Sequence, residues 1–371
     1  LANLIGNINA GGGGVNRNII INGAMNVAQR GTSSTGIGAS SGYFTVDRWK
    51  IVASATAGRL TMTQDSSVPT GKGFANSIKL DCTTADTSIA TGEFLLFRQS
   101  IEGQNLQGFA KGTSEAKPFV LSFYVKGNAN ATYVAELADV DNSRTAGKAF
   151  NVTTDWTRVE LTFTTDTTGA FDDDNSASLE LSIWLHAGAT FNDPSGTLQQ
   201  TFASTTNSNR AVGISSFFSS TDNTFFITGV QLEVGQNPTE FEHRPIDLEF
   251  HRCLRYFEKL QNTDSSTTQK LGTGSSNLGG GIWYGAGQVI GGFDYKLTKR
   301  ATPTIACDDD QGLKCYTGQA SRTVNDSNMF DIIRVSDCRL NLGNFNINGT
   351  QGYGTWVLID TDHFITIDAE L

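Results

Sequence analysis

The chain has 371 residues, which is more than one typical domain, so the sequence predicts two domains with a substantial core in each. Glycine is abundant at 40 residues, proline is scarce at 6, and charged residues make up only 17% of the chain. The formal net charge of -10 offers no electrostatic route to a nucleic-acid backbone or an anionic membrane surface, so we expect no nucleic-acid partner.

Residues 1–17 are predicted to be an N-terminal tether that attaches the folded part to another protein. They contain the run Gly11 to Gly14, which is typical of a flexible joint. The first residues lack the basic start and long apolar core of a signal peptide. No apolar run in the chain approaches the ~20 residues of a membrane span. We therefore expect no membrane insertion.

Four segments of the region 18–245 alternate apolar and polar residues with the period of a β-strand. They are 119–125, 158–163, 179–186 and 230–234. Runs of period two with one apolar face indicate antiparallel strands that are half-covered by a second sheet. Because clusters of turn-forming residues separate these strands, the sequence predicts a jelly-roll β-sandwich over 18–245.

The segment 246–260 breaks the β pattern, because it lacks glycine and follows Pro245, a residue that suits the first turn of a helix. Five of its residues are spaced as the a and d positions of a coiled coil: Ile246, Phe250, Cys253, Phe257 and Leu260. A helix this short is marginal in isolation, so it must dock on the same chain or on symmetry copies of itself. The sequence predicts a helical collar, with these residues as a candidate trimer interface.

A second β-rich unit is predicted over 261–371, with a domain boundary near 260–281 where Ser, Thr and Gly dominate. Its candidate strands are 282–290, 304–306, 332–335, 355–360 and a closing strand from Phe364. The predicted fold class is all-β: a jelly-roll β-sandwich, then a short helix and a smaller β-rich C-terminal domain.

A series of motifs, taken in chain order, resembles a bacteriophage tail fibre. Those of the first domain are 18–31, 43–49, 97–105, 117–126, 226–235, 241–244 and 253–257. The closing unit is similar to the small β-domain at the tip of such fibres, through 299–304 and 368–371. In architecture, the first domain of this family resembles galactose-binding-like or carbohydrate-binding-module jelly rolls.

The resemblance implies a receptor-binding protein in the tail fibre of the virion, which mediates host-cell attachment by binding a glycan such as lipopolysaccharide or capsule. It also implies a homotrimer whose N-terminus joins other tail proteins, and no cofactor. Two alternatives stay open. One is a polysaccharide depolymerase with a carboxylate pair between subunits, which leaves no linear signature. The other is a structural adaptor or decoration protein of the virion.

Aromatic residues beside glycines are the candidate glycan contacts, because binding residues concentrate in such turns. In the C-terminal domain they are Trp283, Tyr284, Tyr316, Tyr353 and Trp356. In the sandwich, Trp184 is expected on the outward face of its strand, together with His186. The alternative for Trp184 is a face buried against a neighbouring subunit. The alternative for the others is that each ring fills a small core.

Linear signatures of catalysis and metal binding are absent from the sequence. It has no H-E-x-x-H, no G-x-S-x-G and no P-loop. The four histidines are scattered without ligand spacing, and the acidic runs 172–174 and 308–310 do not match an EF-hand loop. The five cysteines include no C-x-x-C pair, which indicates buried free thiols. The sequence therefore predicts neither an enzyme nor a metal site.

Overall fold

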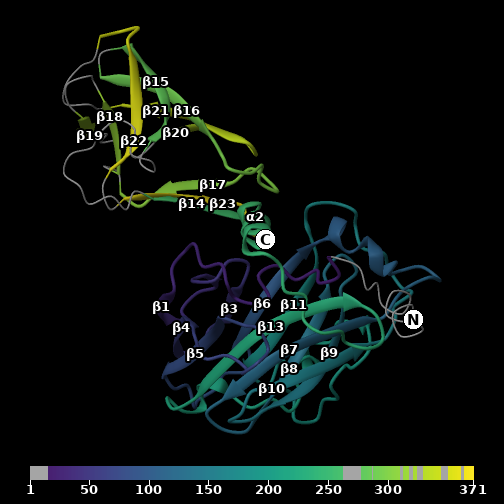
Figure 1. The fold of residues 1–371 in the computed structure, drawn as a ribbon. Helices are drawn as coiled ribbons and strands as arrows, with labels where there is room; N and C mark the ends of the chain where they lie inside the picture. The colour runs from purple at the N-terminus through teal and green to yellow at the C-terminus, as the bar shows by residue number, and fades with distance from the viewer. Residues whose placement is uncertain are drawn as a thin grey trace. The chain divides into compact units, whose positions relative to one another are not determined.

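The computed structural model describes residues 16–261, 277–285, 287–309, 312–316, 321–323, 329–343, 350–360 and 363–371. The chain divides into two compact units (Figure 1): an N-terminal unit of residues 1–249 with Leu371, and a C-terminal unit of 250–370. The boundary predicted near 260–281 lies further along the chain than this division. Apart from Asn16 and Arg17, the predicted tether lies outside the described residues.

The described part of the N-terminal unit is a sandwich of two antiparallel sheets (Figure 1). One has the strand order β1 (Ser33–Ile37), β4 (Arg59–Asp65), β5 (Ser77–Thr84), β13 (Thr224–Val234), β7 (Phe119–Gly127) and β10 (Thr157–Phe163). The other has the order β12 (Ala203–Ser204), β9 (Arg144–Val152), β8 (Ala131–Asp139), β11 (Ala177–Ala187), β6 (Phe94–Glu102), β3 (Lys50–Ser54) and β2 (Gly42–Tyr43). Short 3-10 helices occupy Gly103–Asn105, Gln107–Phe109, Asn207–Asn209 and Phe217–Ser219.

The core of this unit lies between the two sheets and is rich in aromatic rings. Trp49 stacks on Phe97 with ring centroids 4.5 Å apart, and Phe109 stacks on Phe119 at 4.0 Å. All four side chains are buried. Each such ring removes enough apolar surface from water to contribute ~1.5–3 kcal/mol. The predicted all-β fold class, with a sandwich first, is confirmed.

Three of the four strands that alternate in the sequence are buried on both faces, not on one. The strands β7, β11 and β13 have almost no exposed residue, whereas β10 keeps the alternating pattern of a half-covered strand. On β13 the second face is polar and is covered by the chain itself. Glu233 there accepts hydrogen bonds from Gln231 and from the N–H and hydroxyl of Thr239. Local loops therefore cover strands that the sequence pattern leaves half-open.

The helix α2 (Ile246–Leu254) is shorter than the predicted collar. Phe257 and Leu260 are in the strand β14 (Phe257–Gln261), where Phe257 pairs with Asp368 and Leu260 with Ile365. The expectation of one helix over 246–260 is therefore wrong. The physical reason is that the backbone of β14 forms a ladder with a strand far away in the sequence, which local spacing cannot reveal.

The C-terminal unit is built, in its described residues, from two further antiparallel sheets. One has the order β19 (Ser321–Thr323), β18 (Leu313–Tyr316), β22 (Gly354–Ile359), β15 (Asn277–Gly285), β16 (Gln288–Asp294), β21 (Asp337–Leu342) and β20 (Phe330–Ile333). The other has the order β14, β23 (Phe364–Asp368) and β17 (Thr304–Cys307). No helix of the described chain is long and apolar enough to cross a membrane.

The predicted strand 282–290 is in fact a hairpin. The strands β15 and β16 pair antiparallel, and Ile282 is directly opposite Ile290. Gly287 in the turn has a φ of 74°, a left-handed conformation that glycine adopts without steric cost. The run of apolar residues on both sides of the turn made one long strand the simpler interpretation of the sequence.

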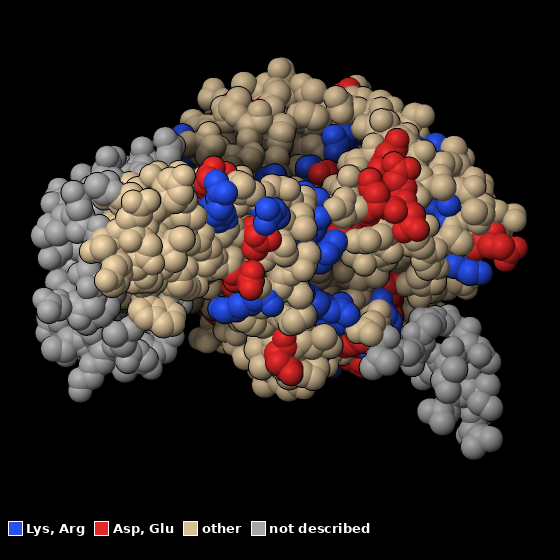
Figure 2. All heavy atoms as spheres, turned by 90° about the horizontal axis from the view of Figure 1, so that it is seen from above, with Lys and Arg blue, Asp and Glu red and all other residues tan. Residues whose placement is uncertain are grey.

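Charged side chains of both signs are mixed over the surface. Figure 2 shows Lys and Arg side chains interspersed with Asp and Glu on the face that it draws. Several form close pairs, such as Arg98 with Glu180 at 2.8 Å and Arg158 with Glu160 at 3.0 Å.

Candidate functional site

The strand β15 separates a buried face of the C-terminal unit from an exposed one. Trp283 is 2% exposed and belongs to the core, whereas its neighbours Ile282 and Tyr284 are 52% and 59% exposed. Because successive side chains of a strand point to opposite faces, Ile282 and Tyr284 share the outer face. An isoleucine and a tyrosine this exposed on one strand are the first indication of a binding surface.

The neighbouring strand β22 adds a tryptophan to the same face. Trp356 is 45% exposed and pairs directly with Gly280, so it shares a face with Gly280, Ile282 and Tyr284. A Cβ added at Gly280 would meet no atom within 4 Å. The glycine therefore leaves open space beside Trp356. We call the surface formed by Ile282, Tyr284, Ile290 and Trp356 the aromatic face.

Amide side chains adjoin the aromatic face on the next two strands. Ile290 of β16 is opposite Ile282, and Asn341 of β21 is opposite Ile290. Gln288 donates a hydrogen bond from its side-chain nitrogen to Asn341 Oδ1 at 2.9 Å. An amide has two donor hydrogens and an acceptor oxygen, so this pair retains capacity for further hydrogen bonds.

A charged hollow of about 300 Å³ lies on the same sheet. Arg339 is opposite Gly292 and pairs with Asp331 through Nε at 3.1 Å, and Arg334 contacts Asp337 at 2.9 Å. Its lining residues are Gly291, Gly292, Phe293, Asp294, Arg334, Asp337, Cys338 and Arg339. The register places Arg339 on the same side of the sheet as Asn341 and the aromatic face.

These groups have complementary chemistry. An aromatic ring offers a flat apolar surface, on which the C–H face of a sugar ring can pack. Amide, guanidinium and carboxylate groups then supply donors and acceptors for hydroxyl groups. Burial raises the pKa of the Cys338 thiol to about 12, so this cysteine beneath the hollow is an unreactive thiol near neutral pH.

Two of the predicted glycan contacts in this unit are on the aromatic face, and two others, Trp283 and Tyr353, are placed differently. Tyr284 and Trp356 lie there. Trp283 does not, because it is buried in the core. Tyr353 is 67% exposed and immediately precedes β22, and its carbonyl accepts a hydrogen bond from the Trp283 N–H, so the strand register does not bring it onto this face. Tyr316 belongs to β18 and pairs with Trp356.

Trp184 is not the outward platform that the sequence predicts. It is 1% exposed, its indole contacts the rings of Phe94 and Phe191, and the Arg210 guanidinium lies 4.9 Å from its ring centroid. The residues Ala211 and Ile214 belong to the same cluster. The covering segment comes from the same chain, so a neighbouring subunit is not needed to bury this face.

The five candidate trimer contacts do not form one exposed seam. Ile246 is 58% exposed, whereas Cys253 and Phe257 are buried within the chain. Phe250 is half-buried on α2, and Leu260 is half-buried on β14. A heptad seam requires a continuous helix over all five, and α2 ends at Leu254. The heptad interpretation of these residues is therefore corrected.

Several residues of this site were not found from the sequence. Gln288, Ile290, Arg339 and Asn341 reach it through the pairing of β16 with β15 and β21. The available signal was the pair of glycines around residue 286, which marks a turn inside the apolar run. A hairpin there would have placed Ile290 opposite Ile282.

No protein-family model and no curated protein match the sequence. Among solved structures, the tailspike protein 4 enzymatically active domain of bacteriophage CBA120 is 14% identical, with a TM-score of 0.31, and the match covers 59% of this chain and 21% of that chain. TmCBM61 in complex with β-1,4-galactotriose is 8% identical, with a TM-score of 0.30, covering 59% and 99%. A family 11 carbohydrate-binding module from Clostridium thermocellum, in complex with a mixed-linked tetrasaccharide, is 10% identical, with a TM-score of 0.27, covering 56% and 98%. Identities and TM-scores this low transfer no function to this chain.

Proposed function

We propose that this protein binds a cell-surface glycan through the aromatic face of its C-terminal unit. The observation that carries the proposal is the exposure of Ile282, Tyr284 and Trp356 on one side of a sheet whose other side is a packed core. An exposed apolar surface bordered by polar groups costs hydration free energy unless a ligand covers it. Flat rings bordered by amides and a guanidinium suit a sugar better than a purely apolar partner.

We further propose that the glycan is lipopolysaccharide or capsule on a bacterial host, and that the protein acts in the tail fibre of a virion. The sequence motifs that resemble tail fibres support this proposal. In the same proposal the protein is a homotrimer, is joined to other tail proteins by its N-terminus, and binds without catalysis. Three weak sites on one particle would gain avidity through effective concentration.

The test compares binding of the full chain and its variants to bacterial cells and to an array of bacterial polysaccharides. Trp356→Ala and Tyr284→Ala are each expected to weaken binding by ~30-fold or more, as the loss of a binding hot spot of ~2 kcal/mol does. Val335→Ala, which also trims an exposed apolar side chain of the C-terminal unit, is the matched control and should bind normally. Circular dichroism confirms that each variant is folded.

Normal binding by both aromatic variants would contradict the proposed site. New reducing ends after incubation with capsule or lipopolysaccharide would instead support the alternative that the protein is a polysaccharide depolymerase. If the intact protein neither binds cells nor blocks phage adsorption, the alternative of a structural adaptor or decoration protein of the virion is favoured. Mass photometry of the intact protein should show trimers, and monomers alone would remove the trimer from the proposal.

A further inference from the structure

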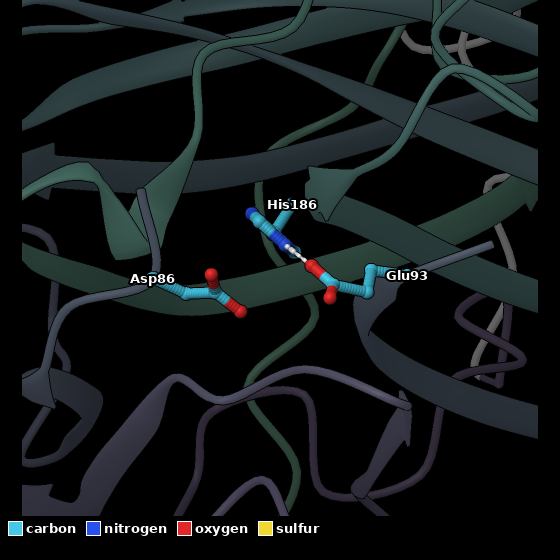
Figure 3. Close-up of side chains that lie close together, drawn as sticks. All are labelled: Asp86, Glu93 and His186. Atoms are coloured by element: carbon cyan, nitrogen blue, oxygen red, sulfur yellow. Dashed lines mark ion pairs between the residues drawn. The ribbon is translucent and has the colours of Figure 1, made fainter. Parts of the chain in front are cut away.

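Three side chains that could ligate a metal ion meet inside the N-terminal unit, two from one loop and one from a strand far along the chain. Asp86 and Glu93 belong to the loop between β5 and β6, and His186 belongs to β11. Their ligand atoms all lie within 4.8 Å of one another, and all three residues are buried. Figure 3 shows the three side chains converging on one space, with a dashed line that marks the close contact between His186 and Glu93. The residues between Asp86 and Glu93, 87–92, are all exposed.

Two buried atoms of this cluster lack a hydrogen-bond partner among the described residues. They are Glu93 Oε2 and His186 Nε2. The two atoms face each other at 3.5 Å, while His186 is 0% and Glu93 7% exposed. Buried polar atoms in native proteins are almost always satisfied, and a separation of 3.5 Å is long for a hydrogen bond, so the space between these two atoms suits a bridging ion. Two ligand atoms of a tetrahedral zinc ion, each ~2.0–2.2 Å from the metal, are separated by a similar distance.

Two other polar atoms of the cluster, His186 Nδ1 and Asp86 Oδ2, are held in position by hydrogen bonds. His186 Nδ1 lies 2.8 Å from Ser216 Oγ, so Nδ1–H can donate to the hydroxyl and leave the lone pair on Nε2. Asp86 Oδ2 accepts hydrogen bonds from Thr56 Oγ1 and the Ala57 N–H, both at 2.8 Å. A metal-bound histidine commonly has such a partner on its other ring nitrogen.

The backbone around the cluster is fixed as well. The Asp86 N–H donates to the Phe218 carbonyl at 2.8 Å, and the Gly188 N–H donates to the Glu93 carbonyl at 2.8 Å. The His186 ring packs edge-on against Phe218 at 5.4 Å. A polar hollow of about 170 Å³ includes Ser216, the partner of His186 Nδ1, in its lining. The three ligands are thus preorganised before any ion binds.

We propose that Asp86, Glu93 and His186 bind a zinc ion that fastens the β5–β6 loop to β11. The donor set of one imidazole and two carboxylates suits zinc, whereas calcium prefers six to eight oxygen ligands. With three protein ligands in a buried place, a water molecule completes the tetrahedron. The ion would join the two ends of an exposed loop to a core strand. This site is independent of the aromatic face.

The test uses tag-free, full-length protein that has been stripped with EDTA and freed of chelator. Calorimetric titration with Zn²⁺ should show one ion per chain. Zinc at 100 times its Kd should raise the Tm of the unaltered protein by ~5 °C or more. Two variants remove a ligand: Glu93→Gln, and His186→Asn, whose amide can still bond Ser216. Each should bind zinc at least ~10-fold more weakly.

The matched control is His363→Asn, which removes another histidine–carboxylate contact, 3.3 Å from Asp308. It should bind zinc as the unaltered protein does. Cobalt substitution should give a spectrum without thiolate charge-transfer bands, which excludes the five free cysteines as ligands. If the unaltered protein shows neither zinc uptake nor a Tm shift, the proposal is overturned. Unchanged affinity in both ligand variants would overturn it equally, and if they fail to fold, the Tm shift and cobalt spectrum of the unaltered chain decide.

Discussion

At the residue scale, a buried charge network stabilises the N-terminal unit. The Lys111 ammonium contacts the carboxylates of Asp139 and, at 3.2 Å, Asp166, and it donates to the Thr168 carbonyl at 2.8 Å. Arg144 binds Asp166 in a bidentate manner, at 2.8 and 2.9 Å. Removal of one member would leave the others desolvated and short of a partner, so the network contributes through its completeness.

Asp166 gives this network a defined pH dependence. Burial on its own would raise the pKa of Asp166, but hydrogen bonds from Arg144, the Thr168 N–H and Lys111 outweigh it and hold the pKa below its ordinary value of 3.8. A carboxylate with a lowered folded-state pKa stabilises the protein above its unfolded pKa, and this stability is lost as the pH falls through the folded pKa. The Asp166 contribution is therefore present at neutral pH and disappears below about pH 4.

We expect Asp166→Asn to lower the free energy of unfolding at pH 7 by ~1–3 kcal/mol, the scale of hydrogen bonds to a charged group. The variant should also lose less stability than the unaltered protein between about pH 4 and pH 2. Urea denaturation at several pH values measures both effects. Asp222→Asn, at an exposed aspartate, is the control. A variant whose stability falls in parallel with that of the unaltered protein would show that Asp166 does not titrate as described.

The neighbours Trp283 and Tyr284 show which part of the site could not be predicted from the sequence. Trp283 and Tyr284 both follow a run of glycines, and the sequence gives no reason to separate them. In the strand, Trp283 is 2% and Tyr284 59% exposed, because neighbouring side chains point to opposite faces. The aromatic contacts were predicted as residue types near turns. Their division between core and surface required the register of β15.

At the element scale, strands with a period of two were predicted well and their environment was not. The strand β11 was expected from its alternation, with Trp184 outward. The covering residues, such as Phe191 and Ile214, come from a long connection after the strand and follow no local pattern. The helix α2 likewise begins directly after Pro245, as predicted. It ends at Leu254, earlier than predicted, because the residues that follow form β14, which pairs with β23.

The variant Trp184→Ala tests whether this ring belongs to the core or to a glycan-binding surface. It should destabilise the N-terminal unit by ~3–5 kcal/mol, because it leaves a cavity beside Phe94, Phe191 and the Arg210 guanidinium. Glycan binding at temperatures where the variant is folded should be unchanged. Thermal denaturation and the cell-binding assay measure the two properties. If the variant is nearly as stable as the unaltered protein and has lost glycan binding, Trp184 is a glycan contact after all.

At the scale of the whole molecule, composition and alternation were sufficient for the fold class. A chain rich in glycine and poor in charge, with repeated alternating runs, predicts β-sandwich architecture, and both described units are built mainly of antiparallel sheets. The cluster of Asp86, Glu93 and His186 could not be predicted, because its members are brought together only by the sandwich. Long-range pairing is the physical information that a single sequence does not display.

Hydroxyl-radical footprinting of the intact protein tests the glycan site most directly. The protein is labelled with and without saturating lipopolysaccharide or capsule, and mass spectrometry measures oxidation at each aromatic residue. We expect the glycan to protect Trp356 and Tyr284 and to leave Trp156 of the N-terminal unit, which is half-buried, unchanged. Protection confined to the N-terminal unit, with Trp356 and Tyr284 oxidised as in the free protein, would contradict the proposed function.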